Sequence, residues 1–279
     1  MLARVSGKLI LCATPIGNLG DTSARLQEAL AAADLVYAED TRRAAKLLRA
    51  LDVRTPVRSY FVGNEQDRAR ELGGRLSEGQ TVALVTDAGM PSIADPGLSA
   101  VRAAIGAGAE VTVVPGPSAV TAALAVSGLP AERFVFEGFL PRKGRERRNR
   151  LEAIASEMRT TVLFGAKSRL VRDLTDLRDY LGPDRETVVT RELTKAFEEV
   201  WRGSLGEAVD AWSGEAPRGE FTIVIAGATR ETPDFEHAVS EVGAAISAGE
   251  SMTDAGRRVS AQLGLSRREL YEAVLRSQK

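Results

Sequence analysis

Apolar residues in the first half of the chain form five short runs, and the segments between them carry apolar residues at helical spacing. The spacing is clearest behind Thr22 and Ser23, the two candidate helix starts, where Leu26, Ala29 and Leu30 recur at i, i+3 and i+4. Strands that are apolar throughout and alternate with helices are typical of a mainly parallel sheet covered on both faces. The predicted strands are 8–14, 35–39, 57–61, 81–86 and 110–115, and the predicted helices lie near 22–33, 41–51, 64–77 and 98–106.

The alternating pattern pauses at Gly128 and Pro130, which predicts a junction between two domains. A second set of strands and helices follows, and from Asp234 onward the pattern is helical. Ser266 and Glu269 have the spacing of a capping box, which predicts two helices joined near 264. The second set comprises strands at 133–139, 160–165, 186–193 and 221–227, with helices near 145–158 and 168–181. We therefore expect two α/β domains at 1–128 and 129–231, and a helical tail at 232–279.

Composition limits the chemistry that this chain is expected to perform. The net charge of −1 gives no overall attraction to nucleic acid, so a polyanion would need a local basic patch. No apolar run approaches the roughly 20 residues of a membrane span, and no signal peptide is evident, so a cytoplasmic protein is expected. With one cysteine, Cys12, and one histidine, His237, we expect neither a metal site of the usual ligands nor an activated nucleophile.

Three loops rich in glycine and proline follow strands of the first domain, at 13–21, 86–97 and 115–120. Ligands of open parallel sheets bind beyond the carboxyl ends of the strands, where these loops gather. The loops match neither the dinucleotide fingerprint nor the phosphate loop, and an acid such as Asp87 suits a hydroxyl or a cationic group. The pattern predicts a small-molecule site, although Asp95 could instead cap the helix that starts near 97.

Seven motifs in order resemble one family over about residues 8–230. The motifs are ATPIGNLGD (13–21), AEDTRRAAKLL (38–48), SY…NE (59–65), TDAGMPSIADPG (86–97), VPGPSA (114–119), FEGFLPRK (136–143) and RELTKAFEEVWRG (191–203). Together they resemble the bacterial 16S ribosomal RNA (cytidine-2′-O)-methyltransferases, of the tetrapyrrole-methylase-like class. The resemblance implies S-adenosyl-L-methionine bound between two α/β domains, the second with a mixed sheet, in a homodimer that acts on the small ribosomal subunit.

The resemblance also implies which residues contact the cofactor. It assigns one position of the first loop, most of the loop at 86–97, two positions after the third loop, and parts of two segments of the second domain. These residues are Pro15, Asp87, Ala88, Gly89, Met90, Ile93, Ala94, Asp95, Ser118, Ala119, Phe164, Gly165, Glu192 and Thr194.

Two stretches depart from the family's pattern. Phe61 and Gly63 stand where the family usually has histidines, and Gly165, Lys167 and Ser168 replace most of a Glu-x-Pro-His-Arg run. These departures affect placement of the substrate more than binding of the cofactor.

Methyl transfer from a sulfonium to a ribose hydroxyl benefits from a nearby proton acceptor. Without a suitable histidine, the candidates are the carboxylates Asp87, Glu39, Asp40 and Glu192. Asp40 has an alternative role as the cap of the helix that begins at Thr41.

RNA contact is expected from local basic patches, chiefly in the run 141–150. In isolation such a run is also typical of a solvated helix face. Lys195 either anchors a phosphate or pairs with Glu198 or Glu199 on a helix. The expected RNA-binding residues are Arg42, Arg43, Arg142, Lys143, Arg145, Arg147, Arg148 and Lys195, with Arg257, Arg258, Arg267 and Arg268 of the tail as an extension unless the tail packs as a lid.

Two other functions fit the same fold. One is a methyltransferase of tetrapyrroles or other small molecules, and the other is a non-catalytic RNA-binding assembly factor. The basic run and the AEDTR and RELTK stretches favour the RNA-modifying enzyme.

Overall fold

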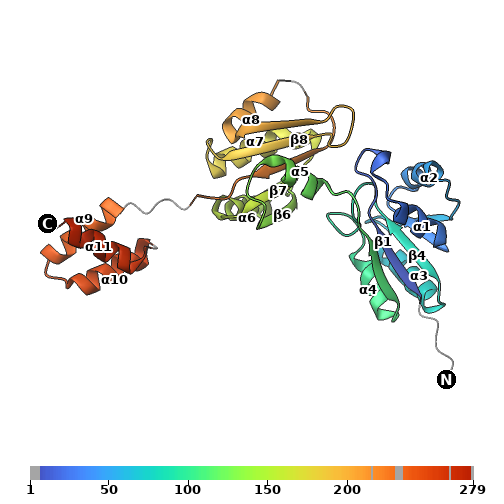
Figure 1. Ribbon diagram of the computed structural model, residues 1–279, viewed down its shortest axis with the longest axis horizontal. Coiled ribbons are helices and arrows are strands. Elements are labelled where there is room, and N and C mark those ends of the chain that lie inside the picture. Colours follow the sequence, from blue (N-terminus) through green and yellow to red (C-terminus); the bar gives the residue numbers. More distant parts are fainter. Residues whose placement is uncertain (1–6, 215, 230–234, 264, 278–279) are drawn as a thin grey trace. The chain divides into compact units, whose positions relative to one another are not determined.

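The computed structural model describes residues 7–214, 216–229, 235–263 and 265–277 (Figure 1). The chain divides into two compact units between Ala226 and Gly227. The first unit contains two five-stranded sheets, and the second is helical.

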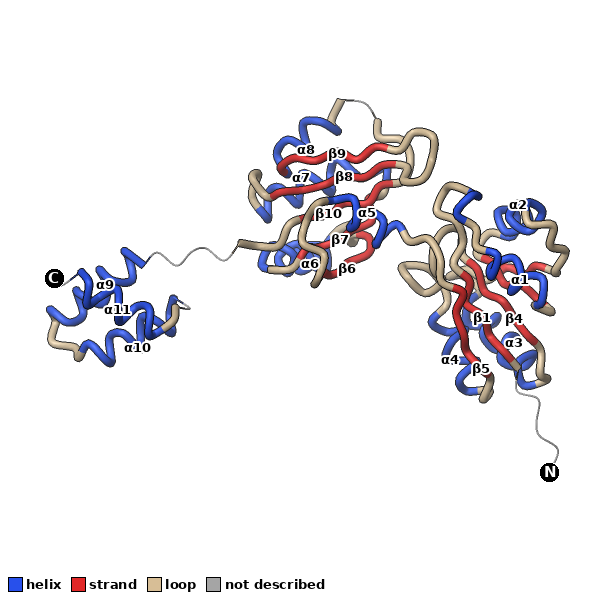
Figure 2. Tube along the Cα trace, in the orientation of Figure 1, coloured by secondary structure: helices blue, strands red, loops and turns tan. Residues whose placement is uncertain are grey.

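The first sheet is parallel throughout, with strand order β3-β2-β4-β1-β5. Because successive side chains of a strand face opposite sides, Leu9 enters one core with Leu72 and Leu84, while Cys12 enters another with Leu26. Figure 2 shows α1 and α2 on one side of this sheet and α3 and α4 on the other, which confirms the expected parallel sheet covered on both faces. The elements are β1 (Lys8–Cys12), α1 (Ala24–Ala32), β2 (Leu35–Ala38), α2 (Thr41–Ala50), β3 (Val57–Ser59), α3 (Glu65–Ser77), β4 (Thr81–Val85), α4 (Leu98–Gly106) and β5 (Glu110–Val114), with a short 3-10 turn at Leu19–Asp21.

The second sheet is mixed, as expected, with order β6-β7-β10-β8-β9. Only the β6–β7 pair is parallel, and the other pairs are antiparallel. Helices α6, α7 and α8 cover one face, around Leu163 and Ile223. The elements are β6 (Phe134–Phe139), α6 (Gly144–Ser156), β7 (Thr160–Gly165), α7 (Leu170–Leu181, after a 3-10 turn at Lys167–Arg169), β8 (Glu186–Arg191), β9 (Glu199–Ser204), α8 (Leu205–Trp212) and β10 (Phe221–Ile225).

Helix α5 (Ala119–Ser127) covers the other face of the second sheet. Its Val120 and Leu124 pack with Val162, Val188 and Val224 of β7, β8 and β10. The predicted domain boundary after residue 128, where the alternating pattern pauses, assigns this helix to the first domain. The packing moves the change of sheet to the loop before α5.

Strand β9 and helix α8 were not anticipated from the sequence. The sequence did contain a signal, because Ser204 and Glu207 form a capping box in which each side chain accepts a backbone N–H of the other residue.

The second unit consists of α9 (Phe235–Ser247), α10 (Met252–Leu263) and α11 (Arg267–Ser277) around its own apolar core. Ser266 accepts the N–H of Glu269 at 3.4 Å, while the predicted joint at Gly264 lies outside the described residues. Arg258 pairs with Glu241 and Glu250 inside this unit, so its charge is partly neutralised there. Within the described ranges, no helix is both long and apolar enough to cross a membrane.

Candidate functional site

The first and second glycine-rich loops are joined to each other at their bases. Thr14 N donates to Gly89 O at 2.9 Å, Gly89 N donates to Thr14 O at 3.0 Å, and the Thr14 hydroxyl donates to Thr86 O at 3.2 Å. Gly89 has a φ of +75°, in the left-handed region that residues with a Cβ rarely adopt. These contacts fix the path of the backbone from Asp87 to Met90.

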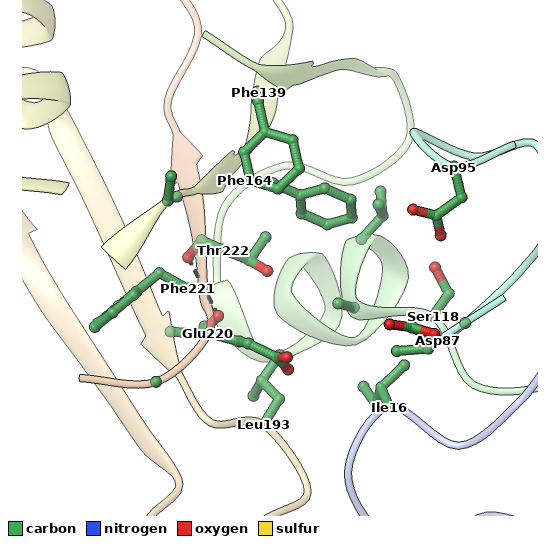
Figure 3. Close-up of a pocket in the computed structure, with 18 of the residues that line it drawn as sticks. Ile16, Asp87, Asp95, Ser118, Phe139, Phe164, Leu193, Glu220, Phe221 and Thr222 are labelled. Carbon is green, nitrogen blue, oxygen red and sulfur yellow. Dashed lines mark hydrogen bonds between the residues drawn. The ribbon is translucent and has the colours of Figure 1, made fainter. Parts of the chain in front are cut away.

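A cavity of about 640 Å³ opens beside these loops and is lined by both α/β domains (Figure 3). Its volume lies within the roughly 300–1,000 Å³ typical of small-molecule sites. The lining residues are Ile16, Glu39, Arg43, Asp87, Ala88, Gly89, Met90, Ile93, Asp95, Ser118, Ala119, Val120, Phe139, Phe164, Gly165, Ala166, Lys167, Ser168, Thr190, Glu192, Leu193, Gly219, Glu220, Phe221 and Thr222.

Most residues expected at the cofactor line this cavity, but three do not. Pro15, Ala94 and Thr194 are absent from the wall, and Ile16 lines it in place of Pro15. Ala94 lies exposed on a turn, and the backbone N–H of Thr194 is engaged by the carboxylate of Glu198 at 2.6 Å. These three residues therefore lie outside the cavity lining, and their contact with the cofactor stays a prediction.

A row of three residues crosses the second sheet at the cavity wall. Thr222 on β10 pairs with Phe164 on β7 and with Thr190 on β8, so the three residues stand in line across the sheet. Antiparallel pairing of strands far apart in the chain creates this row, and no local pattern encodes it.

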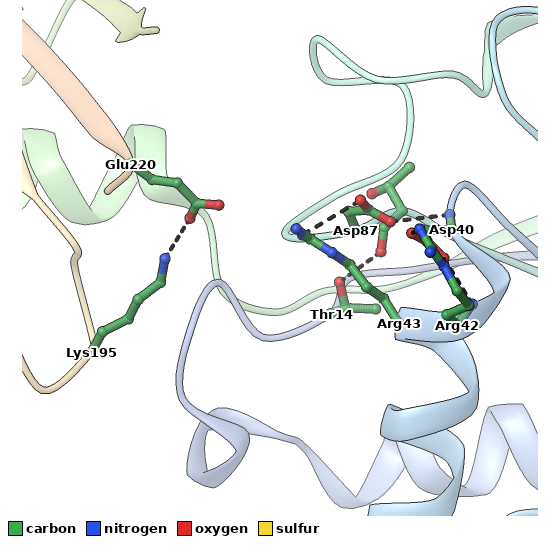
Figure 4. A network of polar contacts seen from close by, with 8 residues as sticks. Thr14, Asp40, Arg42, Arg43, Asp87, Lys195 and Glu220 are labelled. Atoms are coloured by element: carbon green, nitrogen blue, oxygen red, sulfur yellow. Dashed lines mark hydrogen bonds and ion pairs between the residues drawn. The ribbon is translucent and has the colours of Figure 1, made fainter. Parts of the chain in front are cut away.

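Asp87 is held at both carboxylate oxygens (Figure 4). Its Oδ1 accepts the backbone N–H of Asp40 at 3.1 Å, and its Oδ2 lies 3.4 Å from Nη1 of Arg43. Asp87 therefore presents a charged, oriented carboxylate at the cavity wall.

Asp40 performs the capping role and does not line the cavity. Its Oδ1 accepts the backbone N–H of Arg42 at 2.8 Å, and its Oδ2 pairs with the guanidinium of Arg42 at 2.8 Å. Hydrogen bonds from Arg42 hold the pKa of this carboxyl well below its usual range. Asp40 therefore takes its alternative role as the helix cap, and this geometry does not favour its predicted role as a catalytic base.

The charges of Glu39 and Asp95 are less fully paired with cations than those of the other acidic residues that line the cavity. Burial and the charge of Asp87 raise the pKa of Glu39. Burial raises the pKa of Asp95 to about 6, with the charge of Glu39 acting in the same direction. Helix α4 starts at Gly97 without a side-chain cap, so Asp95 serves the cavity and not the helix.

The raised pKa of Asp95 predicts a loss of stability as the pH rises from about 4 to 6. In that window the folded protein keeps a proton that the unfolded chain has released, so the free energy of unfolding falls with increasing pH. We expect Asp95→Asn to remove this contribution and to be more stable than the wild type at pH 8. Urea denaturation at pH 4, 5, 6 and 8 measures the free energy of unfolding of both proteins, with Asp210→Asn, a substitution at an exposed position, as the control. An unchanged pH dependence in Asp95→Asn would contradict the assignment.

Lys195 links two acids of the second domain. Its Nζ lies 2.8 Å from Oε1 of Glu192. It also lies 2.7 Å from Oε2 of Glu220, the contact drawn in Figure 4. Oε1 of Glu192 also accepts the N–H of Glu220 at 2.8 Å. The pKa of the Glu192 carboxyl is lowered, chiefly by the hydrogen bond from Lys195. The expected pairing with Glu198 or Glu199 on a helix is wrong, because the chain turns here.

The two loops that line the cavity contain strained backbone. Ser92 and Ala94 have φ values of +72° and +63°, and Glu192 and Thr194 have values of +52° and +69°. Non-glycine residues in this region persist only where surrounding contacts hold them, and they are concentrated at functional sites. Both walls of the cavity thus include backbone that the rest of the fold holds in place.

The wall chemistry suits a cationic ligand with an apolar planar part. Five acidic and two basic residues line the cavity, together with aromatic and aliphatic side chains. An excess of carboxylates disfavours a phosphate and favours a sulfonium or ammonium group. Among the described residues, no cluster of histidine, cysteine, aspartate and glutamate has the geometry of a metal site.

Two of the departures from the family pattern are coupled to each other. A Cβ on Gly63 would lie 2.6 Å from the ring of Phe61, so a larger residue at 63 would have to displace that exposed ring. A Cβ on Gly165 would lie 2.9 Å from Cβ of Phe221 and 3.1 Å from Leu170, so no larger residue fits there without displacement.

The basic run 141–150 is exposed except at three positions, Pro141, Arg147 and Arg150. Arg142, Lys143, Arg145 and Arg148 are exposed and form no ion pair with any described residue. Their charge is available to an external polyanion.

Arg147 is 4% exposed and holds α6 against α7. Its Nη2 lies 2.8 Å from Oδ1 of Asp173 and 2.6 Å from Oδ2 of Asp176, and its Nη1 donates to Pro141 O at 2.9 Å. The expectation that Arg147 binds RNA is therefore wrong, because its guanidinium is enclosed and fully used.

Comparisons with known proteins agree with this architecture. Residues 8–209 match the family described as Tetrapyrrole (Corrin/Porphyrin) Methylases. The chain is 46% identical over 272 residues to the ribosomal RNA small subunit methyltransferase I of Synechocystis, covering 96% of this chain and 98% of that protein. It is 47% identical over 277 residues to the protein of the same name from Mycobacterium tuberculosis, covering 98% and 96%.

A solved structure shows the same fold at lower identity. The uroporphyrin-III C-methyl transferase of Thermus thermophilus, complexed with S-adenyl homocysteine, is 21% identical and superposes with a TM-score of 0.55. The similarity covers 78% of this chain and 97% of that one.

Proposed function

The chain belongs to the tetrapyrrole (corrin/porphyrin) methylase family and to the ribosomal RNA small subunit methyltransferase I proteins, and we propose that it methylates the 2′-hydroxyl of a cytidine ribose in 16S ribosomal RNA, using S-adenosyl-L-methionine. The observation that carries the proposal is an acid-rich cavity in the same unit as four exposed basic residues that form no ion pair with any described residue, namely Arg142, Lys143, Arg145 and Arg148. The acids suit a cationic methyl donor, and the basic residues suit a polyanionic acceptor.

The cavity residues divide into groups that would hold different parts of the cofactor. When bound, S-adenosylmethionine supplies an electrophilic methyl group on a sulfonium. Asp87 and Glu192 are fixed carboxylates for its cationic or hydroxyl groups, and Ile16, Val120 and Phe164 offer apolar surface for its adenine. Transfer by in-line displacement needs the hydroxyl oxygen held in line with the methyl carbon, so positioning by these walls supplies much of the acceleration.

Two carboxylates are available to accept the proton that leaves the ribose hydroxyl. Asp87 and Glu192 are each committed to a cation and a backbone N–H, whereas Glu39 and Asp95 form no ion pair within the described part of the chain. Their pKa values are raised toward the working pH, where a general base is most effective. We therefore place proton acceptance at the Glu39–Asp95 side of the cavity.

Transfer of a radiolabelled methyl group tests the function directly. Purified protein is incubated with labelled S-adenosylmethionine and small ribosomal subunits, from cells that lack this protein and, as a control, from wild-type cells. We expect label only in the unmodified subunits, at one 2′-O-methylcytidine located by mass spectrometry. Cofactor binding without transfer to the subunit would contradict the RNA assignment, and no calorimetric signal with the cofactor would favour an assembly factor.

Two further features of the proposal concern the cellular location and the oligomeric state. We propose that the protein acts in the cytoplasm, where ribosomal subunits are available, and that it forms a homodimer. Sedimentation of the full-length chain measures the second feature.

A further inference from the structure

Phe139 is 50% exposed, although it lines a cavity with two other phenylalanines nearby. Its ring lies 5.4 Å from that of Phe164, and Phe164 lies 5.0 Å from Phe136. The three rings form an aromatic row whose outer member, Phe139, offers a free face. Figure 3 shows the rings of Phe139 and Phe164 on one wall and the carboxyl of Asp95 across from them.

A β-bulge directs Phe139 to this position. Phe136 pairs with Val162, but Phe139 pairs with Phe164, so β6 contains one residue more than β7 over this interval. In a regular strand, residues three apart point to opposite faces, and the extra residue instead places Phe139 on the face of Phe136. Gly138 has a φ of +64°, which accommodates the irregular backbone.

Three arginines fix the backbone that carries Phe139. Arg150 Nη1 donates to Glu137 O at 3.2 Å, Arg169 Nη1 donates to Leu140 O at 3.1 Å, and Arg147 Nη1 donates to Pro141 O at 2.9 Å. The ring is therefore presented by a braced segment. A fixed aromatic surface loses little conformational entropy when a ligand covers it.

Cations follow Phe139 closely in the chain. Arg142, Lys143 and Arg145 begin three residues later, are exposed, and form no ion pair among the described residues. A cationic methyl donor does not need these groups, whereas a nucleotide phosphate does. A planar apolar face followed by unpaired cations is the combination with which proteins hold unstacked bases of single-stranded RNA.

We propose that Phe139 is a stacking platform for an unpaired nucleobase of the RNA substrate, with the adjacent phosphates held by Arg142, Lys143 and Arg145. The site selects single-stranded RNA at the mouth of the cavity and brings one ribose to the acidic wall. This inference rests on the proposed function, because it names the contact that the RNA makes.

The test compares Phe139→Ala, Phe139→Leu and Phe139→Trp with Phe134→Ala. Phe134 lies on the same strand, is 37% exposed and does not line the cavity. We expect the alanine and leucine variants to lower kcat/KM for the ribosomal subunit about 10- to 100-fold, because stacking on an aromatic ring is lost. Calorimetric affinity for S-adenosylmethionine should change less than twofold. Phe139→Trp and Phe134→Ala should both stay within about threefold of the wild type.

The outcomes separate this inference from the proposed function. A wild-type protein that does not methylate the subunit overturns the proposed function. If the wild type is active, Phe139→Leu with wild-type kcat/KM overturns the stacking role, since leucine keeps the apolar contact but not the ring. Weaker cofactor binding with an unchanged KM for RNA also overturns it, because the ring would then serve the adenine. If the alanine variant fails to fold, the comparison of Phe139→Leu with Phe139→Trp still decides between the outcomes.

Discussion

Asp87→Ala is expected to weaken binding of S-adenosylmethionine about 10- to 100-fold and to reduce methyl transfer to background. The carboxylate is oriented by the Asp40 N–H and by Arg43, and hydrogen bonds to charged groups are stronger than neutral ones. Removing the carboxylate also leaves the positive charge of Arg43 unpaired at the cavity wall, where it repels a cationic ligand. Isothermal calorimetry measures the first effect, and single-turnover methylation of small subunits measures the second.

Asp87→Asn separates the charge from the shape. Its amide oxygen can still accept the N–H of Asp40, so the loop is expected to keep its conformation while the negative charge is lost. We expect the asparagine variant to bind the cofactor as poorly as the alanine variant within about fivefold. Wild-type affinity in Asp87→Asn would contradict a role for the charge and leave Asp87 as a structural residue.

Arg147→Ala is expected to lower the free energy of unfolding by about 3–5 kcal/mol. The substitution leaves Asp173 buried without its cation and removes the donor to Pro141 O. Urea denaturation followed by circular dichroism measures the change.

The neighbouring Arg148→Ala is the matched control for this prediction. Arg148 is exposed, so its loss is expected to change stability by less than about 0.5 kcal/mol while weakening RNA binding and reducing its salt dependence. Equal stability of the two variants would show that the buried ion pair makes no net contribution.

The sequence contained the information that separates these two arginines. Leu151 and Ile154 follow Arg147 at i+4 and i+7, and both are buried with it on the inner face of α6. The same spacing places Asp173 between Leu170 and Leu177 on the buried face of α7. The run is not one basic patch, because this periodicity buries Arg147. The strands other than β9 are predictable because continuous apolar runs need no information about their partners.

Other parts of the site depend on contacts that no local pattern shows. Pairing of Lys195 with Glu198 or Glu199, one of its two predicted roles, requires a helix, but the left-handed backbone at Glu192 and Thr194 ends any regular structure there. The direction of Phe139 depends on a bulge whose only trace in the sequence is Gly138. The loop motif at 86–97 was informative because it combines glycine, proline and acids at a strand end, and its Asp87 to Met90 do line the cavity.

The strained residues of the two wall loops affect how the protein unfolds. Each left-handed non-glycine residue costs on the order of 1–3 kcal/mol, so Ser92, Ala94, Glu192 and Thr194 lower the local stability of the segments that carry them. Such segments open before the sheets do, and the free energy of local opening is smaller than that of global unfolding. A ligand bound between the loops opposes that opening. The wall loops are therefore more ordered when the site is occupied. We therefore expect binding of the methyl donor to stabilise the strained backbone of these two loops more than the sheets.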